Sequence, residues 1–166
     1  HTGYYGTDCS LDQSDYDDII DMRDTLCSNL NATRAMQNID LSVVMSRATI
    51  IADILLDVEV CSTTALTQCT DVLVSMVLEN ADLTGDENVV ILVGQAFSNI
   101  LAKGSTLSSD LMTDVETALS ALTVSAQSNL AVGESPLNLV TDSVKMKLAV
   151  GTGNTIAYEN FTVPQS

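Results

Sequence analysis

The spacing of apolar side chains divides the chain into a long helical part and a short β-like part. From residue 13 to 131, apolar residues recur every three or four positions, which is the spacing of a helix with one buried face. After Gly133 the period falls to two, with an apolar residue at every second position from 144 to 150. The pattern predicts an α+β fold, an antiparallel bundle of about five helices followed by a small antiparallel β segment.

Five helices are expected from this spacing and from the residues that favour helix ends. The first should begin near Ser14, because Ser14 and Asp17 have the spacing of a capping box. The other four are expected over these ranges: about 40–58, 62–80, 87–103 and 108–130. Helices two to four have little purely polar face, so we expect them to pack on several sides.

The β segment is too small to be stable alone. Strands are expected around Leu137 and Leu139 and over 143–150, and after a turn at 151–154 a further strand around 156–163. Two or three strands are marginal by themselves, and their exposed edges invite pairing. We therefore divide the chain into residues 1–12, a bundle over 13–131 and a β segment over 132–166, which flanking sequence or a partner chain completes.

Charge restricts the kinds of partner. The chain has 22 acidic and 6 basic residues and a formal net charge of −16. Nucleic-acid binding needs a basic surface that displaces counterions from phosphates, so this class is not expected. No apolar run approaches the roughly 18 residues of a membrane span. The simplest interpretation is an acidic, solvated surface.

The residues needed for common catalytic sites are missing from the pattern. Catalysis by Ser-His-Asp or Cys-His requires an oriented His, and the only one is His1. No phosphate loop, G-x-S-x-G or H-E-x-x-H motif occurs. We therefore expect no enzyme activity, no catalytic residue and no cofactor. Asp82, Asp86 and Glu87 could hold a weakly bound calcium ion through oxygen ligands, although a capped, solvated loop explains them more simply.

Four cysteines allow two disulfides, which are typical of extracellular proteins. No C-x-x-C pair occurs, so a zinc site is not expected. On a continuous helix Cys61 and Cys69 would be about 12 Å apart, too far to bond, so their pairing requires Cys61 in the loop before the third helix. We favour that pair. The alternatives are a bond from Cys27 to one of these two, joining neighbouring helices, or buried thiols.

Two segments fit the N-glycosylation pattern, Asn31-Ala32-Thr33 and Asn160-Phe161-Thr162. Asn31 is the better candidate, because it falls in the loop expected after the first helix. Glycosylation and disulfides both indicate an extracellular or cell-surface location.

The first nine residues carry the most specific motif. The segment Gly3-Tyr4-Tyr5-Gly6-Thr7-Asp8-Cys9 resembles the end of an epidermal-growth-factor-like module, C-x-x-G-aromatic-x-G-x-x-C. The first cysteine of that motif would immediately precede His1. The resemblance implies that Cys9 pairs with this upstream cysteine, that the chain is a segment of a larger protein, and that one of the other three cysteines is left open to a partner chain. The alternative is a glycine-rich arm with Cys9 bonded to Cys27.

A second resemblance covers the rest of the chain. A helical bundle that leads into Gly133-Glu134-Ser135-Pro136, and then into strands with Phe161-Thr162-Val163-Pro164, is similar to the GAIN region of adhesion receptors and polycystin-type proteins. The resemblance implies a helical subdomain before a β-sandwich, in an adhesion context. The self-cleavage triplet of that family, His-Leu-Ser/Thr, is missing here, so no catalytic residue is carried over.

These features together favour a non-enzymatic structural or adhesion module of a large extracellular assembly, such as a filament, a matrix or a flagellar appendage of the mastigoneme type. Its expected partners are copies of itself or other protein chains of the assembly. One alternative is an ectodomain segment of an adhesion-type or polycystin-like receptor. Another is a small secreted carrier that binds an apolar ligand inside the bundle.

Overall fold

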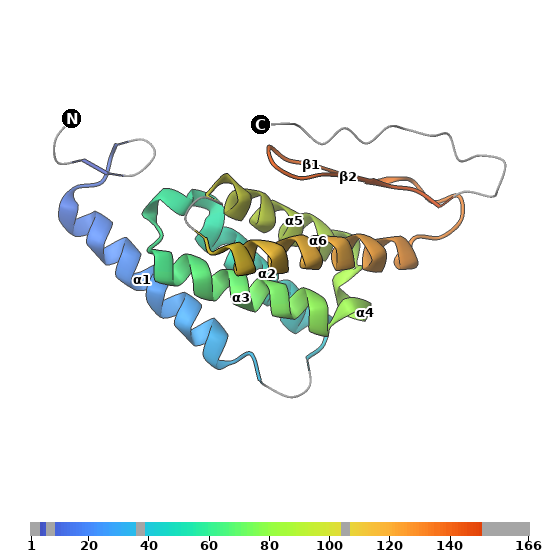
Figure 1. Cartoon of the computed structure of the whole chain (residues 1–166), viewed down its shortest axis with the longest axis horizontal. Helices are drawn as coiled ribbons and strands as arrows, with labels where there is room; N and C mark the ends of the chain where they lie inside the picture. The colour runs from blue at the N-terminus through green and yellow to red at the C-terminus, as the bar shows by residue number, and fades with distance from the viewer. Residues whose placement is uncertain (1–3, 6–8, 36–38, 104–106, 151–166) are drawn as a thin grey trace.

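A computed structural model describes residues 4–5, 9–35, 39–103 and 107–150, and it shows a helical bundle that leads into a small sheet (Figure 1). In chain order the elements are α1 (Gln13–Ala32), α2 (Leu41–Ile54), the 3-10 helix η1 (Leu55–Val60), α3 (Thr63–Glu79), α4 (Ala81–Thr84), α5 (Glu87–Ala102), α6 (Ser109–Asn129), β1 (Leu137–Val140) and β2 (Lys145–Leu148). The predicted α+β fold is confirmed. The short elements η1 and α4 were not expected.

Capping side chains start three helices at the predicted places. The Ser62 hydroxyl accepts a hydrogen bond from the Ala65 N–H at 2.9 Å, and the Ser108 hydroxyl accepts one from the Leu111 N–H at 3.2 Å. Asp86 caps α5 in the same way. Each cap satisfies a backbone donor that the first helical turn leaves without a partner, which is why these three boundaries follow from the sequence.

Helix α1 begins at Gln13, near the predicted Ser14, but the predicted capping box is wrong. The N-cap is Asp12, whose carboxylate accepts a hydrogen bond from the Asp15 N–H at 3.0 Å. Ser14 lies inside the helix, and Asp17 accepts a bond from the Gln13 side chain at 2.7 Å instead of closing a capping box. Aspartate is at least as good an N-cap as serine, so the earlier residue caps the helix.

The second predicted helix ends earlier than its apolar period indicates. Asp57 leaves the helical conformation within η1, with φ −121° and ψ 88°. Its side chain accepts a hydrogen bond from the Glu59 N–H at 3.2 Å, and its carbonyl accepts one from the Arg23 guanidinium on α1. Because these local and tertiary bonds replace helical ones, the segment becomes a 3-10 turn that connects α2 to the loop before α3.

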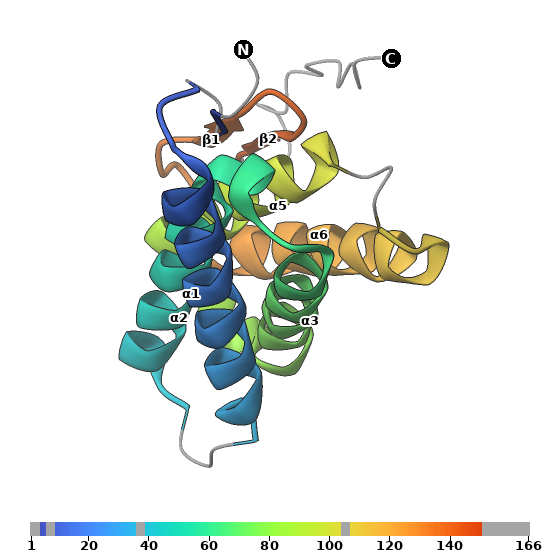
Figure 2. The same cartoon turned by 90° about the vertical axis from the view of Figure 1, so that its left-hand side faces the viewer.

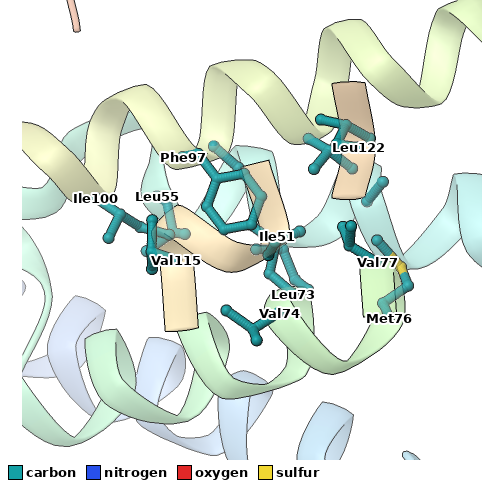
Figure 3. Close-up of a cluster of buried hydrophobic side chains, with 14 of the residues drawn as sticks. Ile51, Leu55, Leu73, Val74, Met76, Val77, Phe97, Ile100, Val115 and Leu122 are labelled. Carbon is teal, nitrogen blue, oxygen red and sulfur yellow. The ribbon is translucent and has the colours of Figure 1, made fainter. Parts of the chain in front are cut away.

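The core lies between two groups of helices: α1, α2 and α3 form one group, and α5 and α6 form the other. Helices α1, α2 and α3 run side by side, whereas α6 crosses α3 steeply (Figure 2). Helix α3 packs against α1 on one side and α6 on the other, and α5 packs against α2. Phe97 is fully buried and points toward Ile51 (Figure 3). The other large side chains that are fully buried are aliphatic: Ile51, Leu55, Leu73, Ile100, Leu122 and several valines.

A half-buried carboxyl group lies where α3 meets α6. Burial raises the pKa of Asp71; nearby Arg34 opposes this shift in pKa, and Asp114 on α6 adds to it. Because the folded pKa lies above the unfolded one, the folded state holds the Asp71 proton more tightly. Ionisation of Asp71 therefore destabilises the fold at neutral pH, and this cost disappears as the pH falls below the ordinary aspartate range.

We expect Asp71→Asn to raise the urea midpoint of unfolding slightly at pH 7, because it removes the buried charge. The gain should shrink as the pH is lowered and should vanish at about pH 3, where both forms are neutral. Asp53→Asn, at an exposed position on α2, controls for the loss of one negative charge. An equal gain in both variants, or a gain in Asp71→Asn that does not depend on pH, would contradict the assignment.

The sheet rests on α5 and α6 through one apolar face (Figure 1). Its two strands are antiparallel, with Leu137 opposite Leu148 and Leu139 opposite Met146. These four side chains are buried, whereas the side chains between them are exposed. A Cβ added to Gly94 of α5 would lie 2.1 Å from Leu139 Cδ2, so the missing side chain of this glycine lets β1 approach the helix closely.

Candidate functional site

One disulfide joins α1 to α3. Cys27 and Cys69 are bonded, their Cα atoms are 5.1 Å apart, and both residues are completely buried. The favoured pairing of Cys61 with Cys69 is therefore wrong, and the alternative in which Cys27 joins neighbouring helices is the observed one. Cys69 lies on the buried face of α3 that packs against α1, whereas Cys61 lies in the extended segment before that helix.

Cys61 is a half-buried thiol held inside the protein. Its Sγ lies 3.5 Å from the Ile54 carbonyl, and the Arg23 guanidinium donates a hydrogen bond to it at 3.3 Å. Burial raises the pKa of this thiol, and the bond from Arg23 opposes that shift. The neutral thiol therefore predominates at neutral pH, which makes Cys61 a poor nucleophile.

The N-terminal segment folds back on the start of α1. Tyr5 and Leu11 form an antiparallel bridge through two backbone hydrogen bonds of 2.8 and 3.2 Å. The rings of Tyr5 and Tyr16 stack with their centroids 4.6 Å apart. Cys9 lies between the two bridge residues as an exposed free thiol with a φ of 55°. Since Cys27 bonds to Cys69, the alternative Cys9–Cys27 pair is wrong; the pairing of Cys9 with an upstream cysteine stays a prediction.

The three carboxylates proposed for calcium have separate surroundings. Asp86 caps α5 by accepting a hydrogen bond from the Asn88 N–H at 3.0 Å. Asp82 is exposed in the first turn of α4, and Glu87 is exposed in the first turn of α5. In the described ranges no group of three His, Cys, Asp or Glu residues is placed to hold a metal ion. The structure therefore supports the capped, solvated loop at this position.

The better glycosylation candidate is accessible but lies on a helix. Asn31 is exposed in the last turn of α1, so its predicted position in a loop is wrong by two residues. The helix extends to Ala32 and ends with the Thr33 N–H bonded to the Asn29 carbonyl at 3.1 Å. The second candidate, Asn160, lies outside the described residues.

A groove between α5 and β1 is the site that sequence reasoning missed. Its volume is about 370 Å³. One wall is a face of α5 with the spacing of successive helical turns, and the other is β1 with the turn that follows it. The lining residues are Ile91, Gln95, Ser98, Asn99, Asn138, Leu139, Val140, Thr141 and Asp142. Most of them are polar, unlike the mainly apolar lining of a small-molecule pocket.

The backbone of β1 faces this groove. The Thr141 N–H donates to the Val144 carbonyl at 2.9 Å, which makes Thr141 and Val144 a hydrogen-bonded pair at the turn. Antiparallel pairs alternate, so the pairs of Asn138 and Val140 with β2 are not hydrogen-bonded, and their N–H and C=O groups point away from β2. Among the described residues the sheet has two strands, so this edge of β1 is unpaired.

Unsatisfied and exposed groups line the same groove. The Asn99 Nδ2 atom is buried and has no hydrogen-bond partner in the described structure. Buried amide donors of this kind are rare in folded proteins, because each costs free energy when it is left unpaired. Ile91 on the helical wall is 39% exposed and Val140 on the strand is 75% exposed. The groove therefore offers a donor, a strand edge and two apolar contacts.

Basic residues are distributed unevenly over the fold. The four in the bundle contact neighbouring segments of it. Arg23 donates a hydrogen bond to the Asp57 carbonyl, and Arg47 donates one to the Thr33 carbonyl at 2.6 Å. Arg34 forms an ion pair with Glu79 at 3.6 Å, and Lys103 forms one with Glu59. The other two, Lys145 and Lys147, are on the exposed face of β2. Residues 137–150 contain these two lysines and one acid, Asp142, so this part of a strongly acidic chain has a formal net charge of +1.

None of the described helices combines the length and the apolar character needed to cross a membrane. No protein-family model, curated protein or solved structure matches the chain. We therefore infer a function from the geometry of the groove, the strand edge beside it and the chemistry of the cysteines.

Proposed function

We propose that this chain is a non-enzymatic structural or adhesion module of an extracellular protein assembly, and that its small sheet is the surface through which it joins other chains. The observation that carries the proposal is the edge of β1 beside the groove, which no described residue pairs with, on a sheet whose apolar face packs on a disulfide-bonded bundle. Unpaired edges promote association with other strands unless they are protected.

The rest of the molecule supports the same role. The Cys27–Cys69 disulfide is compatible with an oxidising, extracellular compartment, and Asn31 is exposed as a glycan acceptor must be. The exposed thiol of Cys9 is available to a cysteine outside the described residues, as the resemblance to an epidermal-growth-factor-like module implies. The core side chains around Phe97 contact one another and are fully buried, as expected of a rigid spacer (Figure 3).

Surface cross-linking of the native protein tests this proposal. Intact producing cells would be treated with a membrane-impermeant, lysine-reactive cross-linker, and the protein would be digested without reduction and mapped by mass spectrometry. We expect cross-links between chains that involve Lys145 or Lys147, because both are exposed on the sheet. We also expect a glycan on Asn31.

Lys103 provides the internal control, because it lies in the bundle and pairs with Glu59. Between-chain links should concentrate on the sheet rather than at this residue. A protein that the reagent does not reach on intact cells, or that gives only links within one chain, would contradict the proposal.

A further inference from the structure

We propose, building on the proposed function, that the groove between α5 and β1 binds an extended strand from a second copy of this chain, and that residues 155–163 supply this strand. Copies would then associate head to tail, with the tail of one in the groove of the next. Such a contact joins two different surfaces, so it produces an open chain of copies unless the geometry closes a ring.

The groove fits an extended backbone. Asn138 and Val140 present outward N–H and C=O groups with the spacing of alternate strand residues, so an added strand can continue the ladder. On the opposite wall, no group in the described ranges accepts a hydrogen bond from Asn99 Nδ2. A carbonyl or side-chain oxygen of the added strand would accept that hydrogen bond. Ile91 and Val140 would lose their exposure to water in the same event.

The two edges of the sheet are not equivalent. Charged side chains on a strand, lysine above all, discourage pairing with other chains. Strand β2 has Lys145 and Lys147 at its exposed positions, whereas β1 has Asn138 and Val140 at the matching positions. Strand β2 is therefore protected against pairing with other chains, and the outer edge of β1 is the one that can accept an added strand.

The tail of the same molecule cannot easily occupy this edge. After β2, the expected turn at 151–154 is only four residues long. A turn of this length delivers the next strand antiparallel to β2, at the edge opposite the groove. To reach the groove, the tail would instead have to pass across the end of β1 to a position two strand spacings, about 10 Å, from β2, whereas a tight turn returns the chain to the adjacent position. A second copy has no such restriction.

Charge favours contact between this tail and the sheet of a second copy. Residues 151–166 contain one charged residue, Glu159, in a chain with 22 acidic residues. The sheet that receives the tail has Lys145 and Lys147 and a single acid, Asp142. The tail has one negative charge and the sheet has a formal net charge of +1, so the two approach without the repulsion that arises between acidic surfaces, and Ile156 and Tyr158 supply alternating apolar contacts.

Complementary variants test the proposal in the full chain. Val140→Lys places a charge in the groove, and Ile156→Asp together with Tyr158→Asp places charges in the tail. Sedimentation velocity would be recorded for each protein over a range of concentrations, with Val132→Lys as the matched control, because Val132 is 62% exposed and does not line the groove. Circular dichroism would show that the variants keep the helical fold.

We expect the unaltered chain and Val132→Lys to associate as concentration rises, and each blocked variant alone to stay monomeric. A mixture of the groove variant and the tail variant should form a dimer and nothing larger, because it contains one intact groove and one intact tail. A labelled peptide of residues 154–166 should bind the tail variant, and Val140→Lys should weaken that binding at least tenfold.

Association of Val140→Lys equal to that of the unaltered chain would overturn the proposal. So would association that depends on the groove but not on the tail, because another segment or another protein would then be the occupant. A chain that stays monomeric and does not bind the peptide would also overturn it. Cross-links between the sheet and other proteins on intact cells would in that case leave the proposed function standing, which distinguishes the two failures.

Discussion

Replacing Cys27 and Cys69 together with alanine is expected to lower the free energy of unfolding by about 4 kcal/mol. The two residues are 42 positions apart, so their bond closes a long loop and limits the unfolded chain. Small domains have a total stability of about 5–15 kcal/mol, so this loss is a large part of it. Urea unfolding followed by far-UV circular dichroism, on oxidised protein and on the double variant, measures the difference.

Cys61→Ala is the matched control, because it removes a thiol without breaking the Cys27–Cys69 bond. It should cost much less, since Cys61 is half-buried and makes only weak hydrogen bonds through its sulfur. Reduction of the unaltered protein should reproduce the effect of the double variant. A loss below about 1 kcal/mol in both reduced and doubly substituted protein would show that α1 is held to the bundle without the disulfide.

The disulfide also shows where sequence reasoning succeeds and where it ends. The boundaries of α3, α5 and α6 could be predicted, because strong apolar periods coincide with local capping residues. The pairing of the cysteines depends on which face of α1 is buried, and α1 is mostly polar. Leu26 is 37% exposed there, whereas its neighbour Cys27 is completely buried. A weak period leaves the rotation of a helix undetermined, and with it the partner of its cysteine.

The groove could not be predicted, because neither wall is distinctive alone. In sequence, Gln95 and Asn99 read as ordinary polar positions on the outer side of a helix, and Asn138 and Val140 read as the exposed face of a strand. Only the docking of β1 on α5, which brings together residues more than 35 positions apart, makes one site of them. That the β segment needs a further strand was predicted from its small size. Which strand edge would accept that further strand was not predicted.

The core that supports this groove can be tested through Phe97, the one aromatic residue that is buried in the described part of the chain. Phe97→Ala is expected to lower the free energy of unfolding by about 3–5 kcal/mol, because it removes a large, fully buried side chain and leaves a cavity. The ring points toward Ile51, between the two groups of helices, so the bundle cannot close the gap without moving α5 (Figure 3). Urea unfolding at pH 7 measures the loss.

The same substitution should also weaken binding in the groove. Phe97 lies on α5 beside Ser98 and Asn99, which line the groove, so a shift of the helix moves one wall relative to β1. Leu56→Ala is the control, because Leu56 is 69% exposed and should cost less than about 0.5 kcal/mol. If Phe97→Ala costs as little as this control, the packing of α5 against α2 is not what holds the groove in shape. If stability falls strongly but the protein that stays folded still binds the peptide, the sheet and not the packing of α5 keeps the groove in shape.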